Sequence, residues 1–356
     1  MKPDFNNCIL NVTSSIMKKY NIKSEYSSIK EIDNAIENSA HIFFIILDGL
    51  GKNILEKNLH EDSFIRRNVK KWITSVFPPT TVAATTAALS GISPGTSGWI
   101  GWHQYFKQIN NDIVLFKNIG YYSQDSFNYN VADKYIPYEP FYKKIDNVYC
   151  KTLFPSFIPG GYSTFKEMSE EIIKISYLDF NTYAYCYWDN PDYTIHEFGI
   201  ESKEVKEIIN ELNNYIEEIY NRCNDNTSII LIADHGLIDV EHIYLEDYPD
   251  FLDTLQIEPS IESRTTAFKV KDEDNFKYLF DKYFINKFDL YTSDNLIKEG
   301  FLGKFEIKNK DFLLDYISVA KDKYCFDLKR SDFVMKATHA GGTEDEMIIP
   351  LVILQK

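Results

Sequence analysis

The chain has 356 residues, enough for one large domain or two, and its 44% hydrophobic and 26% charged residues are typical of a soluble globular protein. Its net charge of -15 argues against binding to a nucleic-acid polymer, and it implies that an anionic substrate must meet local positive charge such as a metal ion. The five cysteines are scattered and form no C-x-x-C pair. We find no secretory signal, and no apolar run approaches the ~20 residues that span a bilayer. We therefore expect no disulfide framework, no thiol zinc site, no membrane contact and a cytoplasmic location.

The first candidate ligand follows the first predicted strand. Residues 1–40 predict one or two lead-in helices, for which we expect no chemistry. Residues 41–47 (HIFFIIL) form a continuous apolar run, typical of a strand buried on both faces of a parallel sheet. The run ends at Asp48, and open α/β sheets place their sites at the carboxyl ends of such strands. A helix cap explains an Asp in this position equally well.

A second strand, predicted at residues 71–77, leads into the stretch FPPTTVAATTAALSGISPGTSGWIG. Its prolines favour an extended entry, the small residues 82–89 predict a tightly packed helix, and the following Ser-Gly is typical of a helix end. A threonine at the start of this helix, Thr80 or Thr81, either caps free N–H groups or acts as a nucleophile where those groups attract an anion.

Two further buried strands are predicted at residues 182–188 and 227–233. Each is followed by ligand-type side chains: Asp192 and His196 after the first, Asp234 and His235 after the second. The i, i+4 spacing of the first pair places both side chains on one side of a helical turn, within reach of one metal ion. Chance explains such a spacing on its own, so the pair matters only together with the other ligands.

Residues 245–330 differ in character from the rest of the chain. They are rich in Tyr, Asp, Lys and Glu, and short predicted strands alternate with helices. We interpret them as an inserted, smaller α+β subdomain that caps the metal-binding edge. The catalytic core would then comprise residues 41–244 and 331–356, and its last segment contains His339 before a final helix start and strand.

Together, separate turns of the chain offer oxygen and nitrogen ligands, and several of these turns follow predicted buried strands that would converge on one sheet edge. The candidate ligands are Asp48, Thr81, Asp192, His196, Asp234, His235 and His339. Carboxylates and imidazoles without thiolates suit zinc or a similar divalent ion, and the set is too large for one tetrahedral zinc. Two metals are a known solution for phosphoryl transfer.

These motifs give the sequence its resemblance to the alkaline phosphatase superfamily and, within it, to the type I phosphodiesterase/nucleotide pyrophosphatase family. The matching segments are the DG after the first strand, the FPPTTVAATTAALSG stretch, PDYTIHEFG, ADHG and THAGGTEDEMIIPLVI, in matching order over residues 41–356. The resemblance implies an alkaline-phosphatase-like α/β fold with a mostly parallel sheet sandwiched by helices. It also implies two divalent ions, zinc in the first place and manganese as the alternative, and a phospho-enzyme intermediate.

Carried over residue by residue, the resemblance assigns each ligand to one of two metals. The first would be held by Asp192, His196 and His339, and the second by Asp48, Asp234, His235 and the nucleophile Thr81. Thr81 fits better than Thr80 because the distance back from Ser90-Gly91 matches the family's threonine–glycine spacing.

The chain departs from the family pattern beside the nucleophile. Nucleotide pyrophosphatases commonly carry Phe directly after it and Asn two places later, where this chain has Val82 and Ala84. The difference bears on nucleotide specificity and calls for another phosphate donor, such as the backbone N–H of Val82. Candidates for the leaving-group pocket are Trp99, Trp102 and His103, although simple packing explains each of them as well.

The sequence thus predicts a metal-dependent hydrolase of phosphodiester or pyrophosphate bonds in a small-molecule phosphate ester, acting through a phospho-threonine. Alternatives that keep the same site are a phosphomonoesterase, a phosphonate or sulfate-ester hydrolase, and a phospho-group transferase. A non-catalytic binding protein that retains the fold is disfavoured by the intact ligand set.

Overall fold

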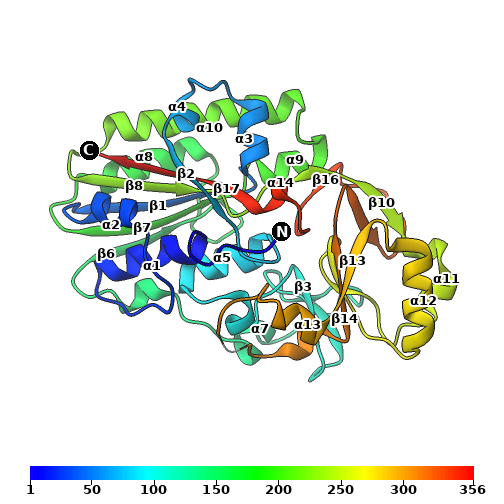
Figure 1. The fold of residues 1–356 in the computed structure, drawn as a ribbon. Helices are drawn as coiled ribbons and strands as arrows, with labels where there is room; N and C mark the ends of the chain where they lie inside the picture. The colour runs from blue at the N-terminus through cyan, green and yellow to red at the C-terminus, as the bar shows by residue number, and fades with distance from the viewer. Residues whose placement is uncertain (306) are drawn as a thin grey trace.

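A six-stranded sheet covered by helices on both faces forms the centre of the computed structural model, which describes residues 1–305 and 307–356 (Figure 1). The strands lie in the order β2 (Val69–Thr74), β17 (Ile348–Gln355), β8 (Thr227–Ile232), β1 (His41–Leu47), β7 (Thr182–Trp188) and β6 (Tyr149–Leu153). Strands β8, β1, β7 and β6 are mutually parallel, whereas β17 runs antiparallel to both β2 and β8. The mostly parallel, helix-covered sheet expected from the sequence is confirmed.

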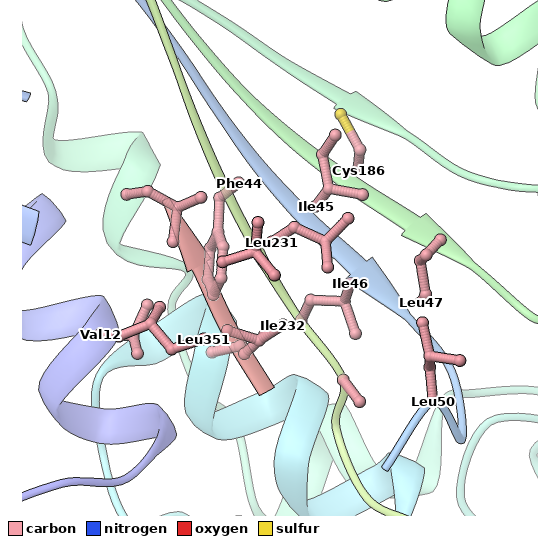
Figure 2. Packing of buried hydrophobic residues seen from close by; sticks show 14 of the residues in the cluster. Val12, Phe44, Ile45, Ile46, Leu47, Leu50, Cys186, Leu231, Ile232 and Leu351 are labelled. Atoms are coloured by element: carbon pink, nitrogen blue, oxygen red, sulfur yellow. The ribbon is translucent and has the colours of Figure 1, made fainter. Parts of the chain in front are cut away.

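The apolar runs become strands because both faces of the sheet are covered. Every residue of β1, β7 and β8 is buried. Figure 2 shows Phe44 and Ile46 of β1 close to Ile232 of β8, with Val12 of the first helix and Leu351 of β17 also in contact with this cluster. Since each fully buried Ile, Leu or Phe stabilises the fold by about 1.5–3 kcal/mol, this cluster fixes the positions of the strand ends that carry the site.

The helices gather in two layers (Figure 1). One layer packs around the long helix α10 (Lys203–Arg222) and contains α3 (Lys52–Asn58), α4 (Phe64–Arg67), α8 (Phe165–Ile175) and α9 (Asp192–Phe198). The other contains α1 (Ile9–Lys19), α2 (Lys30–Ile36) and α5 (Thr81–Ser90). Among the described residues, none of the helices combines the length and apolar character needed to cross a membrane.

A second lobe lies beside the carboxyl ends of the core strands and is built on a seven-stranded sheet (Figure 1). Its order is β13 (Phe288–Thr292), β14 (Tyr316–Ala320), β12 (Thr265–Phe268), β11 (Ser260–Ile261), β3 (His103–Phe106), β4 (Asn111–Val114) and β5 (Ile119–Gly120). The sheet therefore combines strands from residues 103–120 with strands from residues 260–320. The domain boundaries drawn from the sequence, at 245 and 330, stay a prediction.

Short helices and small strand pairs complete this lobe and its junction with the core. The helices are α6 (Pro94–Ser97), α7 (Val131–Tyr135), α11 (Pro249–Leu252), α12 (Glu273–Phe284), α13 (Ser293–Lys298) and α14 (Glu344–Met347). The strand pairs are β10 (Glu241–Tyr244) with β15 (Tyr324–Asp327), and β9 (Ile238–Asp239) with β16 (Ala337–Thr338). Many of the numerous phenylalanines pack between α12 and the second sheet, for example Phe251, Phe268, Phe276 and Phe280.

Candidate functional site

The predicted ligands converge at the carboxyl ends of β1, β7 and β8. Asp48 directly follows β1, and its backbone N–H donates to the carbonyl of Trp188 at the end of β7 (2.9 Å). The N–H of Asp192, the first residue of α9, donates to the carbonyl of Asp48 (3.0 Å). Asp234 follows β8, and its Oδ1 accepts a hydrogen bond from the N–H of Gly49 (3.0 Å). Backbone contacts thus fix three carboxylates at one sheet edge.

Glycine after Asp48 permits this close approach. Gly49 has a φ of +73°, which a residue with a Cβ adopts only under strain. A Cβ there would also lie 2.9 Å from the Cβ of Asp192 and 2.6 Å from the Cδ1 of Leu237. Any side chain at position 49 would therefore push the ligand-bearing loops apart.

Asp192, His196 and His339 form the first ligand group, as predicted from the sequence. The Nε2 of His196 lies 3.2 Å from Asp192 Oδ2, and the Nε2 of His339 lies 3.9 Å from Asp192 Oδ1. One ligand atom from each of the three lies within 4.8 Å of the others. His339 follows β16, so the last segment of the chain closes the group.

Asp48, Asp234, His235 and Thr81 form the second group. The Nε2 of His235 lies 3.3 Å from Asp48 Oδ1 and 3.4 Å from Asp234 Oδ2. The Oγ1 of Thr81 lies 3.2 Å from this Nε2 and 3.4 Å from Asp48 Oδ2. The rings of His235 and His339 stack with their centroids 3.8 Å apart, so the two groups are adjacent.

The three histidines are all oriented in the same way. Each Nδ1 contacts a backbone carbonyl oxygen: His196 that of Ala337 (2.8 Å), His235 that of Gly236 (3.2 Å) and His339 that of Pro79 (3.1 Å). A hydrogen bond from Nδ1–H leaves the lone pair of Nε2 free to bind a metal. These contacts are typical of histidines that bind a metal.

The carboxylates also fit a cation. Asp48 Oδ1, Asp192 Oδ1 and Asp234 Oδ2 are buried and have no hydrogen-bond partner among the described residues. Burying such oxygens without a partner is costly, and a bound cation removes the cost. The donor set of carboxylates and imidazoles suits zinc-class divalent ions, so the residues present fit the two metals that the family resemblance implies.

Burial and neighbouring charges both shift the pKa values of these side chains. Burial raises the pKa of Asp48, and the neighbouring Asp234 and Asp192 raise it further. Burial also raises the pKa of Asp234. Burial alone would lower the pKa of His196, but the charge of Asp192 together with the hydrogen bonds to Asp192 and Ala337 raises that pKa to about 8. The close carboxylates thus repel one another unless positive charge lies between them.

Thr81 and Thr80 face different partners. Thr81 is the first residue of α5, where the N–H groups have no carbonyl partner within the helix, so they and the helix dipole favour an anion. Thr80 is the N-cap, yet its side chain makes no capping bond and donates instead to Glu262 Oε1 (2.6 Å). The geometry therefore places only Thr81 of the pair beside the ligand groups.

A cavity of about 470 Å³ opens in front of Thr81. Of the residues proposed for the leaving-group pocket, Trp102 and His103 line it, and His103 stacks on Tyr121 (3.8 Å between centroids). Trp99 does not: it is buried and donates its indole N–H to the carbonyl of Ile136 (2.8 Å). The side chain of Val82, whose backbone N–H is the proposed phosphate donor, is also wholly buried in the core. Neither side chain can reach a substrate there, because both pack into the core of the second lobe.

Two residues near the site were missed by the sequence analysis. Glu262 lines the cavity, and its Oε1 accepts from Thr80 Oγ1 and from the N–H of Trp102 (2.7 Å). The hydroxyl of Tyr187, in β7, donates to Asp48 Oδ2. Tyr187 lies in a run that predicts buried strand, and no local pattern marks Glu262, so neither had a recognisable signal.

The basic side chains that line the cavity are histidines: His103, His196, His242 and His339. Among the described residues that line it, none is Lys or Arg, whereas Asp192, Glu262 and Asp327 contribute carboxylates. A phosphate group entering this cavity would meet negative charge unless cations occupy the two ligand groups.

Comparisons with known proteins bear on the family and the fold of the chain. A family model described as type I phosphodiesterase/nucleotide pyrophosphatase matches residues 42–332. A curated relative, a bis(5'-adenosyl)-triphosphatase of Mus musculus, is 23% identical over 158 residues, which are 43% of this chain and 34% of the relative. The chain thus matches about a third of the length of that relative.

Solved structures show the same fold. Murine ectonucleotide pyrophosphatase/phosphodiesterase 5, as an inactive variant in complex with AMP, superposes with a TM-score of 0.66 and 16% identity, covering 87% of each chain. The human protein of the same name gives a TM-score of 0.67 and 14% identity, covering 88% of this chain and 87% of that chain.

Proposed function

Because the chain belongs to the type I phosphodiesterase/nucleotide pyrophosphatase family, we propose that it hydrolyses phosphodiester or pyrophosphate bonds in a small-molecule phosphate ester, with Thr81 as the nucleophile. The observation that carries this proposal is the position of the Thr81 hydroxyl at a helix start, 3.2 Å from His235 Nε2 and 3.4 Å from Asp48 Oδ2. An ordinary threonine hydroxyl is a weak nucleophile, so it requires such an activating environment.

Two divalent cations, zinc in the first place, complete the proposed site. Asp192, His196 and His339 would hold one, and Asp48, Asp234, His235 and Thr81 the other. When bound, such ions lower the pKa of a coordinated hydroxyl and neutralise charge on a phosphate group. The absence of lysine and arginine from the described residues that line the cavity supports this dependence on metal.

The chain's own residues account for the rest of the reaction. The Thr81 oxygen attacks phosphorus, the bond from phosphorus to the leaving oxygen breaks, and the first-turn N–H groups of α5, including that of Val82, bind a phosphate oxygen. Water then cleaves the phospho-threonine and restores the hydroxyl. Tyr187 holds Asp48 in place throughout by its hydrogen bond to Oδ2.

Aromatic side chains in the cavity support a planar or apolar leaving group. Trp102, Tyr121, Tyr193 and Phe333 line it, and Tyr193 and Phe333 are largely exposed. Val82 and Ala84 replace the family's Phe and Asn, so a nucleotide base would have to stack on these cavity residues instead. The murine structure in complex with AMP makes nucleotide esters a reasonable first test.

The test compares Thr81→Ala, Thr81→Ser and Thr80→Ala at equal zinc loading on bis(4-nitrophenyl) phosphate and on 4-nitrophenyl thymidine monophosphate. We expect Thr81→Ala to lose about a thousandfold or more of the turnover, as when an enzyme's nucleophile is removed. Thr81→Ser keeps part of the turnover because its oxygen survives, and Thr80→Ala stays within about tenfold of the native chain. Near-native turnover of Thr81→Ala would refute the proposed nucleophile.

A substrate panel separates the proposed activity from its alternatives. A 4-nitrophenyl monoester, a phosphonate ester and a sulfate ester are measured beside the two diesters. The proposal requires a higher kcat/KM on at least one diester than on the monoester or the sulfate. Product analysis with added glycerol detects transfer to an alcohol in place of water.

A further inference from the structure

We propose that His242, Cys325 and Asp327 form a third metal site, distinct from the two ligand groups around Thr81, which takes a zinc-class divalent ion. One ligand atom from each of the three side chains lies within 4.8 Å of the others. All three residues line the same cavity as Thr81, so an ion can reach them from solvent.

The strand pair β10–β15 brings these residues together. Its parallel register places His242 opposite Cys325, although 83 residues separate them in the chain. Because side chains alternate along a strand, Asp327 lies on the same face as Cys325. Ile243 and Phe326 point the other way, into the phenylalanine-rich core of the second lobe.

The orientation of His242 is that of a metal ligand. Its Nε2 contacts the carbonyl oxygen of Met335 (2.7 Å), so a proton on Nε2 is held by that carbonyl. The opposite nitrogen, Nδ1, then faces Asp327 Oδ2 at 2.5 Å and Cys325 Sγ at 3.4 Å. The three histidines beside Thr81 make the same kind of contact with a backbone carbonyl, but through Nδ1 instead of Nε2.

The cysteine separates this cluster from a simple histidine–aspartate ion pair. Cys325 is 1% exposed, and its sulfur turns toward the imidazole nitrogen within the strand pair. Thiolate, imidazole and carboxylate together suit zinc and not magnesium or calcium, and three protein ligands leave one position open, here toward the cavity. The lack of a C-x-x-C pattern predicted no thiol zinc site, but a single thiolate from a distant strand does not need that pattern.

Cobalt titration of the chelator-treated full-length protein tests the site. Cobalt bound to a thiolate gives a sulfur-to-metal charge-transfer absorption in the near ultraviolet, which the thiol-free ligands around Thr81 cannot produce. We expect this band to saturate in the native chain, to disappear in Cys325→Ser with one bound cobalt fewer, and to persist in the matched control Cys150→Ser. We expect His242→Gln to weaken cobalt binding at this site at least tenfold.

The outcomes of this test distinguish failure of the third metal site from failure of the proposed function. Thr81→Ala must keep the band, since Thr81 belongs to neither the cluster nor its strands. If Cys325→Ser fails to fold, His242→Gln and Asp327→Asn provide the same readout at partly exposed side chains. Absence of the band in the native chain, or a band that survives in Cys325→Ser, overturns the third site whatever the hydrolase assays give.

Discussion

At the scale of single residues, Glu262 ties the helix of the nucleophile to the second sheet. Its Oε1 accepts from the hydroxyl of Thr80, at the start of α5, and from the N–H of Trp102, in the cavity wall. Burial raises the pKa of Glu262. It touches none of the proposed metal ligands through these bonds, so we regard it as a positioning residue.

Replacing Glu262 tests whether it positions the start of α5 without contributing to metal binding. In Glu262→Ala both donors lose their acceptor and the start of α5 can shift, and a displacement of about 1 Å at a reacting group can cost about a hundredfold in rate. We expect kcat to fall about ten- to a hundredfold with the zinc content unchanged, and Glu262→Gln to recover most of it because its amide oxygen still accepts. Unchanged kcat in Glu262→Ala would exclude the positioning role.

At the scale of elements, a buried ion pair holds the turn that carries His339. Arg264 donates from Nε and one terminal nitrogen to Glu346 (2.6 and 2.8 Å), and both side chains are wholly buried. Glu346 also accepts from the N–H of Gly341 (2.7 Å) and the hydroxyl of Thr343 (2.7 Å). Arg264, directly before β12, and Glu346 of α14 thus hold the turn at residues 339–343 in place.

We expect Glu346→Gln to lower the free energy of unfolding by about 3–5 kcal/mol, because it leaves the charge of Arg264 buried without a carboxylate, with only neutral acceptors such as the carbonyls of Asp322 and Tyr324. Denaturant unfolding measures this loss. The exposed pair Arg222–Glu170 is the control, and Glu170→Gln should leave the unfolding midpoint almost unchanged. A Glu346→Gln midpoint equal to the native one would contradict the role of the pair.

The same pair predicts a pH dependence. Burial alone would raise the pKa of Glu346, but Arg264 outweighs it and the pKa lies below its usual value. A carboxylate whose pKa is lowered by folding stabilises the native state at pH values above its pKa in the unfolded chain, about 4.3. This stabilisation is lost as the pH falls below that value. Between pH 5 and pH 3 the native chain should therefore lose more stability than Glu346→Gln, as unfolding curves at each pH would show.

At the scale of the whole molecule, metal removal should destabilise the fold. Chelation leaves Asp48, Asp192 and Asp234 buried close together, each with an oxygen that has no hydrogen-bond partner. A ligand that binds only the folded state, present at a hundred times its Kd, adds about 2.7 kcal/mol to the free energy of unfolding. We expect the melting temperature to fall by several degrees with chelator and to recover with zinc.

Asp234→Asn serves as the internal comparison for this effect, since it removes one of the repelling charges together with one ligand. It should shrink the difference in melting temperature between the chelated and the zinc-loaded protein. The exposed Asp62→Asn should leave that difference as in the native chain. A native melting temperature that does not respond to chelator would argue against metals at this site.

The core fold and the ligand set were accessible from the sequence because long apolar runs end in ligand-type side chains. His41–Leu47 and Thr182–Trp188 match the predicted strands residue for residue. The second sheet was not accessible, since strands of two to five residues pair across large separations that only the tertiary fold decides. For the same reason the sequence analysis placed Trp99 in the cavity wall and missed Glu262.

The pairing of β3 with β11 has a consequence for attempts to exchange substrate range between relatives. A graft that replaces residues 245–330 alone exchanges β11 to β14, so the host's own β3 must pair with a foreign β11. The cavity in front of Thr81 is lined by several separate stretches, including residues 102–121, 242–263 and 325–339, so a transplant of residues 245–330 alone does not carry the whole wall. A change of substrate range in this fold would accordingly require matched changes in several distant segments of the chain, not a single insertion.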